Sequence, residues 1–275
     1  MSNIGWSLCA FLICDIYRNM SNKIENCQIP EIQAAIRNSP IGEKLGSIVR
    51  WTKFRTDIQS GGETLEQWIE LLGPTAIVLT HQEYFVDFVM LFSDLIDSDI
   101  IELFMLATAI HDIGEAANGD ISAQVKSVAD DQAEIVAAQS LIMKLKVNLE
   151  CVDQLLFAYN QVIAGEDQEL HALFKTFERL EYLDTGMHVA KQLNAGHTMQ
   201  LGWYLVAKVL AMDLSKIFIY RKTHPTIVDR YLENNFQIIE SSFQQSAIAV
   251  DETFGAKFLD AQESWQAWKL TSHGQ

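Results

Sequence analysis

A histidine followed directly by an aspartate, His111-Asp112, closes the apolar segment 100–110. Apolar residues recur at helical spacing through that segment, so it predicts a buried helix. A buried helix that finishes in His-Asp places an imidazole nitrogen beside a carboxylate oxygen, and neither belongs in apolar surroundings without a partner. Two more carboxylates, Glu115 and Asp120, follow at once. These residue types suit a metal site, and the alternative is a helix end whose polar residues are exposed.

A second histidine, His81, occupies the start of another predicted helix. It lies within Thr80-His81-Gln82-Glu83, a Thr-x-x-Glu pattern that is typical of a capping box. We therefore expect a helix from this point to about residue 96, with His81 in its first turn. A lone histidine there is usually a surface residue, and it gains interest only if it faces His111 and Asp112.

An aspartate, Asp184, interrupts the apolar stripe of a third predicted helix, 169–193. The stripe has alternating steps of four and three, which is the pattern of one helix face. Its members are Leu173, Phe177, Leu180, Asp184 and Met187. A buried, unpaired carboxylate costs several kcal/mol, so this aspartate needs a cation or strong donors. A salt bridge to Arg179 or Lys191 would meet that need, and so would a metal ion.

One divalent ion would satisfy all four residues, His81, His111, Asp112 and Asp184. Two imidazoles and two carboxylates suit a transition metal such as Mn, Co, Zn, Ni or Fe, with positions left for water. Calcium would want more oxygen ligands. A bound ion of this kind lowers the pKa of its water and supplies hydroxide near neutral pH.

Basic residues gather in the segment 45–56, which is unusual in so acidic a chain. Arg50 could make bidentate contacts to a phosphate, and the adjacent Trp51 offers a rigid flat wall. Lys126 could also reach a phosphate. For all three residues, an ordinary helix with solvated charges and a packed tryptophan is the alternative.

The residues named so far resemble the H…HD…D signature of the HD-domain metal-dependent phosphohydrolases. The segment HDIGEAANGDI, followed by Val-Lys, is similar to the HD-x-x-E-x-x-x-x-GD segment of the 5'-deoxynucleotidase branch, and VRWTKFR is similar to its Arg-Trp segment. The resemblance covers residues 45–193. The chain departs from the pattern in an apparent insertion around 57–75 and in Thr80, which precedes His81 in place of the usual Ser-x-x-Glu.

The resemblance implies roles for four residues beyond the metal ligands. Glu115 and Asp120 would both be catalytic, with Asp120 on the side of the attacking water and Glu115 on the side of the leaving group. Arg50 would hold the phosphate. Trp51 would press on the sugar, where a 2'-hydroxyl would clash.

The expected architecture is all-α, an HD-domain helical bundle with additional helices at both ends. Four prolines occur in the chain, and none lies between Pro74 and Pro225, so nothing there forbids helix. We expect an N-terminal helical extension at 1–44, the phosphohydrolase core at 45–193 and C-terminal helices packed on it at 194–275. Apolar faces of the C-terminal helices would suit a homodimer contact or a cap over the site.

Composition limits the classes of partner. The formal net charge is −16, which disfavours binding of polymeric DNA or RNA but permits a small phosphorylated substrate beside a metal. The four cysteines, Cys9, Cys14, Cys27 and Cys151, show no CxxC spacing, and we expect reduced thiols in a cytoplasmic protein. No basic start precedes the first apolar run and no charge-free run is long enough for a membrane span, so neither a signal peptide nor a membrane partner is expected.

The sequence thus predicts a divalent-metal-dependent phosphohydrolase that acts on a nucleoside 5'-monophosphate. A phosphodiesterase or another nucleotide hydrolase on the same metal site is the nearest alternative. A non-catalytic protein that senses a nucleotide or metal would keep the fold without needing Glu115 and Asp120. A helical interaction protein without metal would leave Asp184 unexplained.

Overall fold

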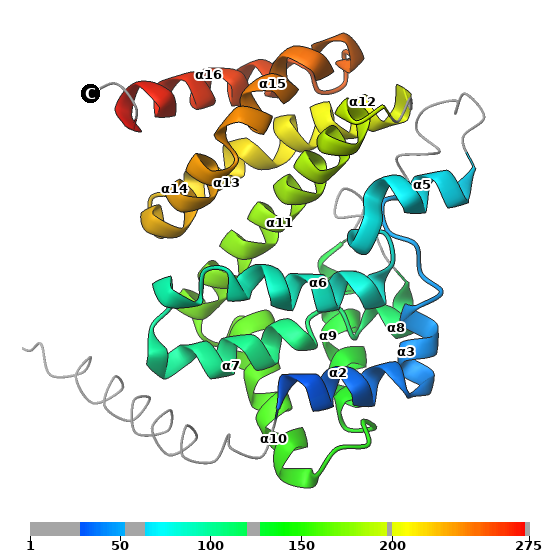
Figure 1. The fold of residues 1–275 in the computed structure, drawn as a ribbon. Helices are drawn as coiled ribbons and strands as arrows, with labels where there is room; N and C mark the ends of the chain where they lie inside the picture. The colour runs from blue at the N-terminus through cyan, green and yellow to red at the C-terminus, as the bar shows by residue number, and fades with distance from the viewer. Residues whose placement is uncertain (1–27, 53–63, 120–126, 197–199, 273–275) are drawn as a thin grey trace, which may run out of the picture. The chain divides into compact units, whose positions relative to one another are not determined.

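The computed structural model describes residues 28–52, 64–119, 127–196 and 200–272 (Figure 1). Within these residues every regular element is helical, and the β structure is limited to an isolated bridge between Val49 and Ile77. The predicted all-α class is confirmed. Helix dominates because apolar residues recur at a period near 3.6, and because prolines stand at helix starts, as Pro40 and Pro225 do.

The chain divides into two units, and each unit combines two separate segments of the sequence. The first unit combines Met1–Ile48 with Gln82–His171, and the second combines Val49–His81 with Ala172–Gln275. These limits do not coincide with the predicted limits at 44 and 193, because residues 49–81 group with the part of the chain from Ala172 onward. Gly73 shows the reason: its backbone approaches His188 so closely that an added Cβ would lie 2.8 Å from the imidazole Nε2.

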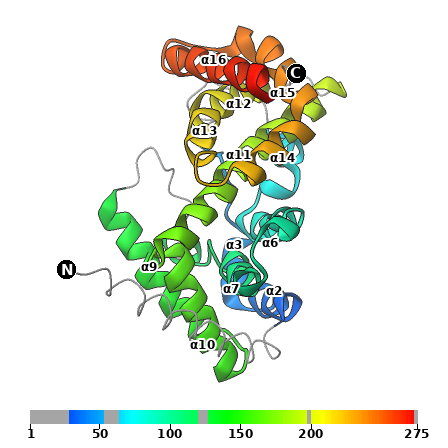
Figure 2. The same ribbon diagram turned by 90° about the vertical axis from the view of Figure 1, so that its left-hand side faces the viewer.

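In the first unit, α7 (Ser98–Ala109) is the central helix. The other elements are α2 (Ile29–Arg37), α3 (Pro40–Leu45), α6 (Val78–Met90), η3 (Ser93–Leu95), α8 (Glu115–Asn118), α9 (Val128–Ile142), α10 (Leu149–Ala158) and η4 (Tyr159–Ile163). Every residue of α7 from Leu103 to Ala109 is buried, and the helix packs against α2, α10 and η4. Helix α9 lies next to α10 (Figure 2), and it also contacts α8. The predicted apolar helix that leads to His111 is therefore confirmed as a core element.

The second unit is built around α11 (Gln168–Asn194) and the C-terminal helices. Its other elements are α5 (Leu65–Leu72), η2 (Gly73–Thr75), α12 (Gln200–Val209), η5 (Leu210–Leu214), α13 (Ser215–Tyr220), α14 (Pro225–Asn234), α15 (Phe236–Ser246), η6 (Ala247–Ala249) and α16 (Gly255–Ser272). Helix α16 packs on η5, and α12 packs on α15. Trp265 and Trp268 stack with ring centroids 4.8 Å apart and are buried in this unit.

Several helix limits differ from those predicted. The turns η4 and η5 are π-helical, so the helices predicted at 149–164 and 196–220 each contain a widened turn. The helix predicted at 226–247 is two helices that meet at Asn235. Apolar periodicity does not report a single inserted residue or a short bend, because the same residues stay near the core on both sides of it.

The structure bears on two further predictions, one about the cysteine thiols and one about membrane-spanning helices. Cys151 is disulfide-bonded, so the expectation that all four thiols are reduced is wrong, and the other three cysteines lie outside the described residues. Among the described helices, none combines the length and the hydropathy that crossing a bilayer requires.

Candidate metal centre

The His111 side chain is held at the end of α7 by a backbone carbonyl. Helix α7 ends at Ala109, and His111 Nδ1 lies 2.7 Å from the carbonyl oxygen of Thr108. A carbonyl oxygen only accepts hydrogen bonds, so Nδ1 carries a proton and donates it. The imidazole also packs edge-on against Phe85, with ring centroids 4.9 Å apart. The ring orientation and its tautomer are therefore both fixed.

The other nitrogen of His111 faces a carboxylate. Nε2 lies 3.1 Å from Asp112 Oδ2, and His111 is buried. With the Nδ1 proton committed to Thr108, a neutral ring presents a lone pair at Nε2, and two acceptors this close repel each other. A cation between them, either a proton on Nε2 or a metal ion, turns the repulsion into attraction. A ligating histidine that donates its second nitrogen to a backbone carbonyl is the usual arrangement at metal sites.

Helix α6 carries His81 to the same place. The side-chain amide of Gln82 donates to the carbonyl oxygen of Ala109, which fastens α6 to the end of α7. Because α6 is continuous through His81 and Gln82, the helix itself sets where His81 lies. One potential ligand atom each of His81, His111 and Asp112 lies within 4.8 Å of the others. This group could hold a metal ion, and it contains three of the four predicted ligands.

The start of α6 differs from the prediction. The helix begins at Val78, and Thr80 Oγ1 donates to the carbonyl oxygen of Ile77, so Thr80 does not cap the helix. The bridge between Val49 and Ile77 aligns the chain before Val78 and lets the helix begin earlier. His81 remains in the first turn, as predicted.

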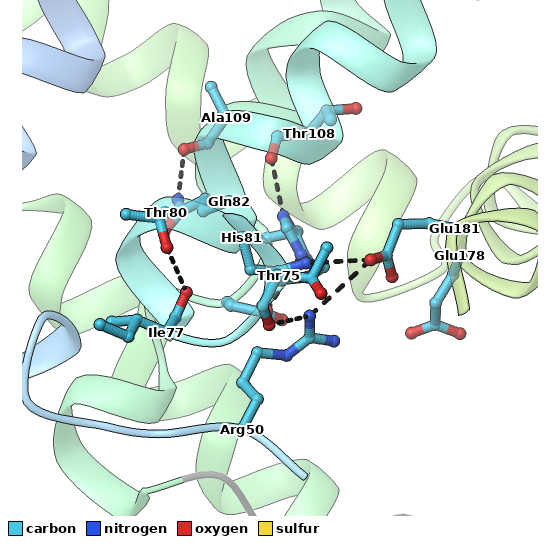
Figure 3. A network of polar contacts seen from close by, with 12 residues as sticks. Arg50, Thr75, Ile77, Thr80, His81, Gln82, Thr108, Ala109, Glu178 and Glu181 are labelled. Atoms are coloured by element: carbon cyan, nitrogen blue, oxygen red, sulfur yellow. Dashed lines mark hydrogen bonds and ion pairs between the residues drawn. The ribbon is translucent and has the colours of Figure 1, made fainter. Parts of the chain in front are cut away.

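Within the second unit, which includes His81, a buried carboxylate, Glu181, lies beside that histidine. Glu181 has no exposed surface, and its Oε1 lies 3.4 Å from His81 Nδ1 and 3.8 Å from Arg50 Nη1 (Figure 3). Thr185 Oγ1 donates to the same oxygen at 2.9 Å. Burial raises the pKa of Glu181, but the charges of His81 and Arg50 and the hydrogen bonds to the carboxylate lower it further, so the net pKa is below its ordinary value. Glu181 is therefore a carboxylate that stays ionised.

Glu181 also has an oxygen without a hydrogen-bond donor. Within the described residues, Oε2 is buried and accepts no hydrogen bond. A buried acceptor of this kind normally contacts a water molecule or an ion. The fit of the His81, His111 and Asp112 group to a cation therefore rests on its own donor atoms and on the Nδ1 contact of His111.

Arg50 is buried, and the backbone around it is tightly held. Its amide donates to the carbonyl oxygen of Ala76 at 2.8 Å, and its guanidinium donates to that of Thr75 at 3.4 Å. The indole of Trp68 donates to the carbonyl oxygen of Arg50 at 3.5 Å. The predicted phosphate ligand is thus a rigid cation that already faces Glu181.

Trp51, the next residue, has a strained backbone. Its φ of 63° lies in the left-handed region, which is a marked outlier for a bulky side chain. The indole packs edge-on against Tyr182 at 5.4 Å, and the guanidinium of Arg50 lies 5.7 Å from its centroid. Strain of this kind persists only where surrounding contacts hold it, and it is concentrated at binding sites.

Asp184 is only half-buried on α11, and the fully buried acid of this helix is Glu181. The hydroxyl of Tyr231 donates to Asp184 Oδ1 at 3.1 Å. The predicted stripe included Asp184, but the core-facing surface of α11 is wider and includes position 181. Asp184 belongs to the second unit, and its role as a fourth ligand stays a prediction.

Of the two predicted catalytic acids, Glu115 is described. It is the first residue of α8, and its amide donates to the carbonyl oxygen of Asp112 at 3.0 Å, so both residues share one turn. Gly114 precedes it and lies against α9, where an added Cβ would be 2.8 Å from the carbonyl oxygen of Glu134. Asp120 and Lys126 lie outside the described residues.

Sequence reasoning missed two residues near the site. Glu181 could have been found from its place one turn after Phe177, on the flank of the apolar stripe. Tyr159 lies buried on η4, and burial, followed by the charges of Glu134 and Asp112, raises its pKa, so the phenol stays protonated near Asp112. No sequence pattern marks Tyr159, because only the π-helical turn determines where it points.

Comparison of the chain with protein-family models, with curated proteins and with solved structures found no match.

Proposed function

We propose that the protein is a divalent-metal-dependent phosphohydrolase. The observation that carries the proposal is the group of His81, His111 and Asp112, in which Nδ1 of His111 faces a backbone carbonyl and Nε2 lies 3.1 Å from the Asp112 carboxylate. Two histidines, each with its Nδ1 facing an oxygen, and an acid suit Mn, Co, Zn, Ni or Fe.

The metal ion would supply a Lewis acid and a more acidic water molecule. The residues around it have separable tasks. The Thr108 carbonyl and Glu181 each face Nδ1 of a histidine, and both would hold the ring with Nε2 available as a ligand. Glu115, in the same turn as Asp112, would move a proton to the leaving oxygen, and Asp120 would act on the attacking side.

A nucleoside 5'-monophosphate is the proposed substrate. Arg50 combines a buried positive charge with a neighbouring flat indole, Trp51, and these two groups suit a phosphate and a sugar or base. The strained backbone of Trp51 supports a binding role, because a structural tryptophan does not need a left-handed conformation. Lys126 would add a second cation to the phosphate site.

The first test is metal content. Purified wild-type protein should hold about one transition-metal ion per chain, and Asp112→Ala, His111→Gln and Asp184→Asn should lose it. His171→Gln is the matched control, since His171 Nδ1 also donates to a backbone carbonyl, that of Val162 at 2.9 Å, but His171 is not in the ligand group. A wild type that holds no metal, and that Mn or Co does not stabilise against heat, would exclude the proposal.

The second test is turnover. The metal-loaded wild type should release phosphate from a panel of deoxy- and ribonucleoside 5'-monophosphates, whereas Glu115→Ala should keep its metal and lose activity. Cleavage of cyclic nucleotides without phosphate release would instead identify a phosphodiesterase. Metal and nucleotide binding without any turnover would identify a sensing protein, and turnover in metal-free Asp112→Ala would rule out the mechanism.

A further inference from the structure

Helix α9 exposes an apolar face that carries no charge. The residues along it are spaced by four, three, four and three, which is the heptad spacing of a helix that pairs with another helix. They are Ala129, Ala133, Val136, Ser140 and Met143, and we call them the α9 stripe. The side chains of Val136 and Met143 are 64% and 60% exposed, although both are large and apolar.

The opposite face of α9 already serves the core of the first unit. Ala138, Ile142 and, just after the helix, Leu145 are buried. An ordinary surface helix is polar on the side that faces away from its core. Helix α9 is apolar on both sides, and a helix of that kind is expected to be covered on both sides.

The charges that flank the α9 stripe differ between its two ends. Asp130 borders the stripe near the start of the helix, where one oxygen of its carboxylate accepts the amide and the hydroxyl of Ser127, and Lys144 borders it on the same edge just after the end. An antiparallel pair of identical helices with Val136 on the two-fold axis would place Val136 against its own copy. Asp130 of one copy would then come within roughly 3 Å, measured along the axis, of the level of Lys144 of the other. Symmetry repeats this ion pair at the other end.

We propose that the α9 stripe is the contact surface for a second copy of this chain, which binds as an antiparallel helix pair. The contact is isologous, since each element of the stripe meets its symmetry mate. The partner is a second copy because the charge pattern is complementary to itself. The chain as a whole carries a net charge of −16, so two copies repel each other except at an uncharged surface with paired ends.

The proposed contact surface is small. A helix of 15 residues spans about 22 Å, so this contact is at the small end of specific interfaces. We expect a reversible dimer that forms in the micromolar range and weakens as salt rises, because the end pairs are exposed. The inference does not depend on the proposed enzymatic activity.

Sedimentation equilibrium of the full-length protein tests the proposal. The wild type should shift from monomer to dimer with rising concentration. Val136→Glu should remain monomeric because it places two like charges on the axis, and Lys144→Glu should weaken the dimer about tenfold by reversing the end pairs. Ile248→Glu is the matched control, because Ile248 is 88% exposed on another surface and its substitution should leave the dimer unchanged.

Cross-linking tests the geometry. Val136→Cys should form a disulfide-linked dimer under mild oxidation, because a residue on a two-fold axis meets its own copy, whereas Ile248→Cys should not exceed the wild-type background. A protein that stays monomeric at every soluble concentration would overturn the proposal. A dimer that Val136→Glu leaves intact would do so as well. A monomer in which Val136→Cys resists a thiol reagent would show instead that another part of this chain, such as residues 1–27, covers the stripe.

Discussion

Replacing Glu181 with glutamine removes one negative charge from the interior and preserves the shape of the side chain. Glu181 is fully buried, and its Oε1 lies 3.8 Å from the guanidinium of Arg50 and 3.4 Å from His81. The substitution leaves Arg50 buried without its carboxylate. We therefore expect Glu181→Gln to destabilise the second unit.

The structure sets the size of the effect. At 3.8 Å and an effective dielectric constant near 20, an ion pair contributes about 4 kcal/mol. Removing one partner of a buried pair costs about 3–5 kcal/mol, because the other charge stays buried. Since Glu181 and Arg50 both have little solvent access, we expect the free energy of unfolding to fall by about 3–5 kcal/mol.

Urea unfolding followed by tryptophan fluorescence measures this loss, because Trp51 and Trp68 lie beside Arg50. Glu178→Gln is the matched control on the same helix. Glu178 pairs with Lys175 at 3.1 Å and with Arg179 at 3.6 Å, and all three side chains keep some solvent access, so its loss should cost no more than about 2 kcal/mol.

The pH dependence of the loss gives a second readout. The pKa of Glu181 is lower in the folded protein than its ordinary value of 4.5, so its stabilisation is present above that pH and disappears as the pH falls through the folded-state pKa. The difference between the wild type and Glu181→Gln should therefore be full at neutral pH and shrink in acid. Equal losses for Glu181→Gln and Glu178→Gln would refute the reasoning. So would a double variant, Arg50→Met with Glu181→Gln, whose loss equals the sum of the two single losses, since coupled charges are not additive.

Three further predictions test the elements that position the site. Gly114→Ala should lower stability by about 1–3 kcal/mol in urea unfolding, because the new Cβ would lie 2.8 Å from the carbonyl oxygen of Glu134; an unchanged midpoint would show that α8 moves freely. Ser127→Ala should cost about 1 kcal/mol of thermal stability by removing the capping box of α9, and Ser127→Thr, which keeps the hydroxyl that donates to Asp130 and accepts from its amide, should recover most of it. Burial raises the pKa of Asp213 from 3.8 to about 6 in spite of Arg179, so the folded state holds a proton there that the unfolded chain has released. As the pH rises through that window, the wild type should lose up to about 3 kcal/mol relative to Asp213→Asn, and parallel stability curves would contradict this.

Local sequence patterns predicted the first and last residues of a helix accurately where one face of that helix packs against the core along its whole length. Helix α5 ends at Gly73-Pro74 as expected, and α11 runs from Gln168 to Asn194 against a prediction of 169–193. The apolar run before His111 is a buried helix that brings the His-Asp pair into the interior. These features follow from neighbouring residues alone, because helical periodicity and chain-breaking residues act over one or two turns.

Other features depend on contacts between segments far apart in the chain. The start of α6 at Val78 follows from the bridge between Val49 and Ile77, so the local Thr-x-x-Glu pattern did not decide it. The assignment of residues 49–81 to the same unit as α11 has the same origin, since Arg50 pairs with Glu181. No local signal reports such pairings.

The acidic residues of α11 show which features of the site follow from the sequence pattern and which depend on tertiary contacts. The stripe pattern correctly identified α11 as a helix with an acid near its apolar face, but it selected Asp184, whereas Glu181 is the acid that is fully buried. Residue types and helical period together determined the fold class and the grouping of His81, His111 and Asp112 as candidate ligands. Which carboxylate is buried, and which nitrogen of His111 carries the proton, depended on Arg50, His81 and the Thr108 carbonyl. The physical reason is that desolvation and ion pairing are set by all the groups around a side chain, and most of those groups come from other helices.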